Sequence, residues 1–167
     1  LAQDEAARTQ IEQQLGEYER AVMSEIETSG DRVAMHEALK HLIIGGNVLL
    51  QVGPEKTRVI HLDSYVVSRS PNGEVLEIVV VEHVSPNALD KATAANILGK
   101  LEGDEKTVEV YTHVERKNEF FTVYQECKGT VVAGTKGKYK KANVPFLPLR
   151  FSRIDGEDYG RGFVEEL

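Results

Sequence analysis

Hydrophobic residues recur at helical spacing over the first thirty residues of the chain. The apolar residues of this stretch are separated by three or four positions, which places them on one stripe of a helix: Ile11, Leu15, Tyr18, Val22 and Ile26. Gly30 provides a stop after the stripe. The pattern predicts one amphipathic helix over about residues 3–28, whose stripe must bury against another surface.

A second helix is predicted directly after the first. Asp31 is a suitable N-cap residue, and Gly45-Gly46 is a strong C-terminal stop. Apolar residues again recur at helical spacing between them: Met35, Ala38, Leu39, Leu42 and Ile43. Because the connection is short, we expect the two helices to pack as an antiparallel hairpin over residues 1–46.

The hydrophobic period then changes from 3.6 to 2, which predicts strands. Pro71-Asn72-Gly73 and Lys117-Asn118 are typical of tight turns, and Pro145 and Pro148 favour an edge position for the last strand. We expect strands at 48–52, 57–62, 65–69, 74–84, 107–116, 119–128, 130–133 and 144–152.

These elements predict an α+β fold in which the strands are mostly antiparallel. We divide the chain into the helical hairpin (1–46), a β-rich region (47–152) and the start of a truncated helix (153–167). The β-rich region contains a short inserted helix near 86–100 and a Gly- and Lys-rich loop at 134–143. The chain begins without Met and stops inside a predicted helix, so we interpret it as a fragment.

Composition narrows the class of protein. The formal net charge of −7 over 167 residues argues against a domain that coats nucleic acid along its whole surface. Cys127 is the single cysteine, and we expect it to be a small packed hydrophobe rather than a nucleophile. The sequence has no apolar run long enough for a membrane span and no secretory signal.

The histidines give no conventional metal spacing. His36 and His41 are five positions apart and do not share a helical face. His61, His83 and His113 lie on different predicted strands and could in principle converge, but we interpret them as surface or partly buried imidazoles. The sequence therefore predicts no metal ligand, no cofactor and no catalytic residue.

The basic residues near the C-terminal third form one cluster: Lys136, Lys138, Lys140 and Lys141. With Tyr139 between them, they could touch a nucleic-acid backbone. The favoured interpretation is a solvated hairpin tip, where lysines protect a strand edge from aggregation. The stretch 134–138 lacks the glycine spacing and the Ser or Thr of a phosphate-binding loop.

Three stretches carry a resemblance to a known family. The Pro-rich strand VPFLPLRF (144–151) leads into GEDYGRGFVEE (156–166). HEALKHLIIGGNVLL (36–50) and RVIHLDSYVVSRSPNGEVLEIVVVEHV (58–84) precede them. Together these stretches resemble portal proteins, the head-to-tail connectors of short-tailed bacteriophages, and the likeness is weakest over 100–143.

The resemblance implies a structural subunit of a homo-oligomeric ring, a dodecamer in this family, at one capsid vertex of the virion. Double-stranded DNA would be packaged through the ring by the terminase and ejected through it. The major capsid protein and a tail adaptor would be further partners, and assembly would occur in the host cytoplasm without a membrane. This chain would form the wing and its approach to the stem, with no catalytic centre.

The GEDYGR stretch supplies the candidate subunit interface: Glu157, Asp158, Tyr159 and Arg161. Arg161 offers a rigid fork for a carboxylate across a subunit boundary, and the glycines at 156, 160 and 162 allow close backbone approach. The alternative is that these residues only turn and cap the chain. Two other functions stay open: a binding module that uses the acidic first helix, and an α+β enzyme with an unrecognised site.

Overall fold

The computed structural model describes residues 2–89, 91, 94–95, 107–165 and 167. Two helices, α1 (Ala2–Thr28) and α2 (Asp31–Gly45), precede two antiparallel sheets. The predicted α+β class is therefore confirmed.

The smaller sheet has three strands. β1 (Asn47–Val52) lies between β2 (Thr57–Ile60) and β9 (Phe146–Arg150), and both pairings are antiparallel. β9 is an edge strand of this sheet, as Pro145 and Pro148 predicted.

The larger sheet has six strands. Its order is β3-β4-β5-β6-β7, and β8 also pairs with β6. The strands have these bounds: β3 (Tyr65–Arg69), β4 (Val75–Val84), β5 (Val108–Lys117), β6 (Phe120–Cys127), β7 (Thr130–Val131) and β8 (Gly137–Lys140).

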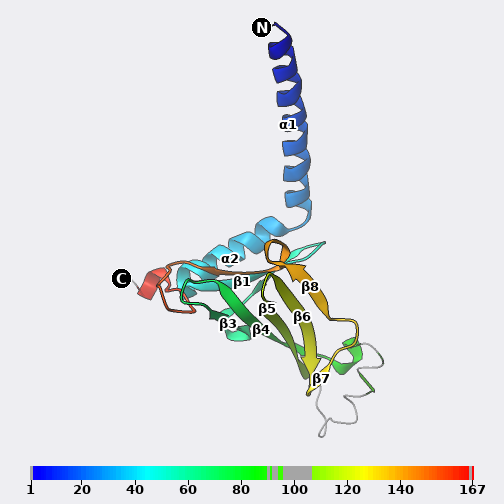
Figure 1. The fold of residues 1–167 in the computed structure, drawn as a ribbon, viewed down its shortest axis with the longest axis vertical. Helices are drawn as coiled ribbons and strands as arrows, with labels where there is room; N and C mark the ends of the chain where they lie inside the picture. The colour runs from blue at the N-terminus through cyan, green and yellow to red at the C-terminus, as the bar shows by residue number, and fades with distance from the viewer. Residues whose placement is uncertain (1, 90, 92–93, 96–106, 166) are drawn as a thin grey trace.

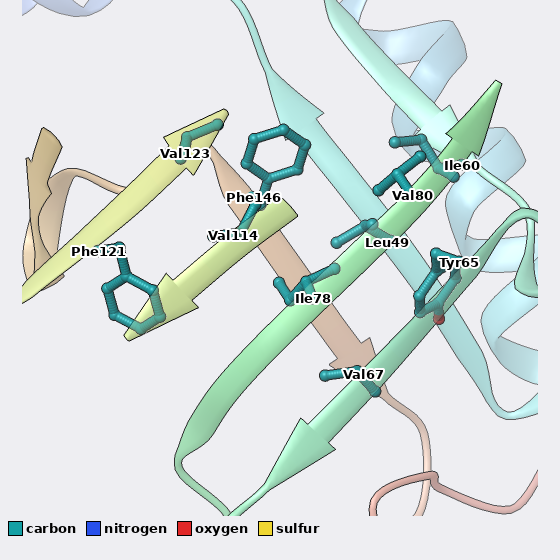
Figure 2. Close-up of a cluster of buried hydrophobic side chains, with 10 residues drawn as sticks. All are labelled: Leu49, Ile60, Tyr65, Val67, Ile78, Val80, Val114, Phe121, Val123 and Phe146. Atoms are coloured by element: carbon teal, nitrogen blue, oxygen red, sulfur yellow. The ribbon is translucent and has the colours of Figure 1, made fainter. Parts of the chain in front are cut away.

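The core lies between the two sheets, and α2 covers the outer face of the smaller one. Leu49 and Phe146 from the smaller sheet meet Ile78 and Val114 from the larger one (Figure 2). The neighbours of Leu49 along β1 point the other way, so that Val48 and Leu50 pack against Ala38 of α2. Because β1 is buried on both faces, its sequence is a continuous apolar run rather than an alternating one.

Cys127 belongs to a second apolar cluster at the far end of the larger sheet. It packs with Val108, Val110 and Val132 and has no exposed surface. Burial raises the pKa of the Cys127 thiol, which keeps it protonated and unreactive. Its predicted role as a small packed hydrophobe is confirmed.

The packing of the first helix differs from the predicted hairpin. α1 extends away from the rest of the molecule, and α2 lies across the base of α1 at a wide angle (Figure 1). Gly30 adopts a left-handed conformation (φ 76°) between the helices. The first residue of α2, Asp31, accepts a hydrogen bond from the backbone N–H of Thr57 (2.9 Å) instead of capping its own helix. This contact holds the start of α2 on β2, while the turn at Gly30 directs α1 outward.

Three further local predictions change. The expected loop at 134–143 contains β8 and a 3-10 turn, η3 (Lys141–Asn143). The sequence does not predict β8, because its lysines alternate with Tyr139 and give no apolar alternation. The inserted helix begins as a 3-10 turn, η2 (Pro86–Ala88), and residues 91, 94 and 95 are helical; its remainder lies outside the described residues. The third prediction is the start of a truncated helix at 153–167. Residues 153–162 instead form irregular turns and bends, and one 3-10 turn, η4 (Phe163–Glu165), follows them.

Candidate subunit-contact surfaces and the C-terminal clasp

The end of α2 and the GEDYGRG stretch meet in close backbone contact. We call this contact between residues 44–47 and 160–162 the clasp. A Cβ on Gly46 would lie 2.4 Å from the carbonyl carbon of Arg161, and one on Gly162 would lie 2.3 Å from the carbonyl oxygen of Ile44. Real Cβ atoms do not approach backbone this closely, so both positions require glycine.

The Asn47 side chain joins the two backbone segments of the clasp by hydrogen bonds. Its side chain is buried, donates to the carbonyl of Gly160 (2.6 Å) and to that of Gly45 (3.1 Å), and accepts from the N–H of Gly160 (2.7 Å). The backbone N–H of Phe151 also donates to the carbonyl of Gly46 (2.8 Å). These bonds satisfy backbone groups that burial would otherwise leave without partners.

Asp158 and Tyr159 hold the same segment against the edge of β3. The Asp158 carboxylate accepts from the backbone N–H of Arg69 (2.6 Å), and the Asp158 carbonyl accepts from the Arg69 Nε (3.0 Å). The Tyr159 hydroxyl accepts from the N–H of Val67 (3.1 Å). These two candidate interface residues therefore direct their polar groups into their own chain.

Arg69 is the centre of these edge contacts. Its guanidinium also donates to the carbonyls of Gly73 (3.2 Å) and Pro148 (2.9 Å). Desolvation by burial, with help from the nearby charge of Arg150, lowers the pKa of Arg69, although an arginine stays charged at neutral pH. One side chain thus joins β3, β9 and the C-terminal segment. The sequence gives no signal for this role.

Glu157 and Arg161 lie on the outer side of the clasp. Arg161 Nη2 and Glu157 Oε1 are 3.3 Å apart, and about half of each side chain is exposed. The backbone carbonyl of Glu157 accepts from Arg150 (2.8 Å). An exposed pair of this kind contributes little to stability, so both charged groups are able to exchange partners.

The apolar stripe of α1 has no cover in the described part of the chain. Tyr18 is 71% exposed, Leu15 61% and Ile11 56%. Where α1 meets α2, a groove of about 820 Å³ opens. Its apolar lining comes from both helices: Met23, Ile26, Met35 and Leu39. An amphipathic helix in water is stable only when its apolar face is buried, which makes this surface a candidate contact.

The lysines in and beside β8 do not form a single patch. Glu74 forms ion pairs with Arg116 and Lys141, which together hold the pKa of Glu74 at about 2. Lys138 lies over the Phe120 ring, 4.1 Å from its centre. Lys136 and Lys140 are exposed to solvent.

Two of the histidines lie close together, although no conventional spacing in the sequence pairs them. The rings of His41 and His61 lie 4.1 Å apart between centres, and Glu37 lies within 4.0 Å of both. The available sequence signal for this group is the Glu37–His41 pair at i, i+4.

Comparison with known proteins identifies the family of this chain. The sequence pattern of the family described as bacteriophage head to tail connecting protein matches residues 2–167. The chain belongs to this family. The two stretches that meet in the clasp, residues 36–50 and 156–166, both lie inside the matched region.

Individual members of the connector family are also similar. The chain is 36% identical to the portal protein of Escherichia phage T7 and 34% identical to that of Enterobacteria phage T3, in each case over 99% of this chain. It is 29% identical to the portal protein of Enterobacteria phage SP6 over 95% of this chain. The chain spans about a third of the length of these relatives. Among the helices of the described residues, none has both the length and the apolar character needed to cross a membrane.

Proposed function

We propose that the chain is the wing part of a phage portal subunit. The subunit assembles with further copies into a ring, a dodecamer, at one capsid vertex of the virion, after synthesis in the host cytoplasm. Double-stranded DNA enters through the ring, driven by the terminase, and leaves through it to the tail. The role is mechanical, and neither a catalytic residue nor a cofactor takes part in it.

The observation that carries this proposal is the exposed apolar stripe of α1. A connector-family chain that leaves a whole helical stripe exposed needs a partner for it, and a second copy of the same chain is the partner that a closed ring supplies. In a ring each subunit offers one surface to the next copy and a different surface to the previous one. The stripe and the groove at the α1–α2 corner are one such surface, so α1 reaches a neighbouring subunit.

Glu157 and Arg161 are charged residues next to and within the clasp that remain available to that neighbour. Their ion pair is half exposed, whereas Asp158 and Tyr159 are engaged by β3. We assign the intersubunit role to this pair and a positioning role to the other two. The major capsid protein and the tail adaptor contact other parts of the subunit.

The lysines in and beside β8 act as a solvated sheet edge rather than as a DNA clamp. Lys138 and Lys141 are engaged within the chain, and the net charge is −7. Tight phosphate contacts would slow DNA that has to slide. A net acidic wing is compatible with a conduit that does not hold its cargo.

The solution mass of the full-length protein tests the ring. Light scattering combined with negative-stain imaging should give rings with a central hole. A folded monomer over a wide concentration range would contradict the portal function and would favour a free-standing binding module. An enzyme would require a substrate pocket with convergent titratable groups.

A further inference from the structure

Three side chains of metal-ligating type lie together beside α2, away from the clasp. Glu37 and His41 are four positions apart on α2 and share one face, and His61 directly follows β2. One ligand atom from each of the three lies within 4.8 Å of the others. The elements that bring them together are α2 and the turn η1 (Leu62–Ser64), which are distant in sequence.

We propose that Glu37, His41 and His61 form a binding site for a divalent transition-metal ion of the Zn²⁺ class. The distance from Glu37 Oε1 to His61 Nε2 is 3.4 Å and to His41 Nε2 is 3.9 Å. Zinc–ligand bonds of about 2.0–2.2 Å at tetrahedral angles put neighbouring ligand atoms about 3.3 Å apart. All donor pairs lie within 4.8 Å, so the two atoms of any pair have to approach by at most about 1.5 Å to reach one ion.

Hydrogen bonds among the three side chains do not engage all of their ligand atoms. The single Glu37 oxygen lies 3.4 Å from one imidazole nitrogen and 3.9 Å from the other, so at most one of them is within hydrogen-bond distance. The two rings also lie 4.1 Å apart, where two protonated imidazoles would repel each other. A cation uses the lone pairs of both rings and the carboxylate at the same time.

The donor set selects the class of ion. Two imidazoles and one carboxylate suit Zn²⁺ and similar transition ions, whereas Mg²⁺ and Ca²⁺ prefer oxygen ligands. His41, Glu37 and His61 are 35%, 49% and 51% exposed, so water has access to the remaining position. The bound ion would link α2 to the end of β2, whereas Asp31 already joins the start of α2 to the start of β2.

A second cluster of similar composition is a weaker candidate and provides a control. Glu77, His113 and Glu115 also lie together on the exposed face of the larger sheet. There, Glu115 accepts a hydrogen bond from Tyr124 (2.9 Å), which lowers the pKa of Glu115, and the His113 ring stacks on Tyr124 at 4.8 Å. These groups are already engaged with each other.

The test is metal binding to the full chain, and it does not depend on the portal function. Zn²⁺ titration calorimetry should give one ion per chain, and Zn²⁺ should raise the melting temperature because it binds only the folded state. Co²⁺ serves as a second probe, since its visible absorption reports nitrogen and oxygen ligands.

Single variants locate the ion. His41→Gln, His61→Gln and Glu37→Gln should each weaken Zn²⁺ binding by at least about tenfold, because even the loss of an outer-shell partner weakens metal sites about 10–100-fold. Two control variants should bind Zn²⁺ as tightly as the unaltered chain: His36→Gln, which is on the same helix, and His113→Gln. Circular dichroism checks that each variant is folded, which the exposure of these side chains favours.

Either of two results would overturn the proposal. One is the absence of saturable one-to-one Zn²⁺ binding by the unaltered chain. The other is binding that survives in the His41→Gln and His61→Gln variants, or that falls equally in His113→Gln, since the ion would then lie elsewhere.

Discussion

The N-terminal helix and the C-terminal segment expose their contact-forming residues to very different degrees. α1 presents Leu15 and Tyr18 to solvent, 61% and 71% exposed. Residues 157–162 instead direct Asp158, Tyr159 and the glycine backbone into the body of the same chain. An interaction-prone sequence therefore indicates the need for a partner, whereas the fold determines whether that partner is in the same chain. Substitutions in the two regions should therefore separate stability from assembly.

The largest loss of stability is expected for Gly162→Ala. The new Cβ would lie 2.3 Å from the Ile44 carbonyl oxygen, which forces the two backbones of the clasp apart. We expect a decrease of about 3 kcal/mol in the free energy of unfolding, measured by urea denaturation of the full chain.

Gly16→Ala is the matched control for this substitution. Gly16 lies in α1 with no atom near the position of a Cβ, so alanine should leave stability unchanged or raise it by up to about 1 kcal/mol. Equal losses in both variants would remove the distinction between the clasp and α1.

Asn47→Ala should have the next largest effect. The substitution leaves the buried N–H and carbonyl of Gly160 without their partner, at a cost of about 2–3 kcal/mol. Asn72→Ala, in the exposed turn before β4, should change the free energy of unfolding by less than about 0.5 kcal/mol. If Asn47→Ala lowered the free energy of unfolding no more than Asn72→Ala does, the Asn47 hydrogen bonds would not stabilise the clasp.

Tyr159→Phe should cost less, about 1 kcal/mol, because it removes only the hydrogen bond from the Val67 N–H and keeps the ring packed. Tyr18→Phe in α1 removes an equivalent hydroxyl from an exposed ring and should have no measurable effect on stability. The two variants can be compared by thermal denaturation under the same conditions. A Tyr18 effect of similar size would mean that α1 packs on its own chain.

The smallest effect on stability, with the largest effect on assembly, is expected for Leu15→Gln combined with Tyr18→Gln. Both side chains are exposed, so the free energy of unfolding of the isolated chain should change by less than about 0.5 kcal/mol. In the full-length protein the same pair should shift the mass from rings to smaller species. Gln13→Ala, on the opposite face of α1, should leave ring formation intact, and rings that persist in the double variant would exclude the stripe from the subunit contact.

Most of the strands could be predicted from the sequence because their signal is local. The Val-rich alternation of β5 and the prolines Pro145 and Pro148 indicate the strands and, for β9, its edge position. Gly45-Gly46 likewise marked the end of α2. β8 was missed because its alternating lysines face solvent and leave Tyr139 as the one aromatic of the strand.

Local patterns in the sequence predict an amphipathic helix whose apolar stripe needs a partner, a mostly antiparallel β region, and glycines that permit close backbone approach in residues 156–162. These features follow from periodicity and from the lack of a Cβ, which act over a few residues. The tertiary structure is needed to show that Gly162 packs on Gly46, that Asp158 and Tyr159 face inward, and that His61 lies beside Glu37 and His41. Those contacts join residues that are 20 to more than 110 positions apart, and their geometry depends on how the sheets and α2 pack as a whole.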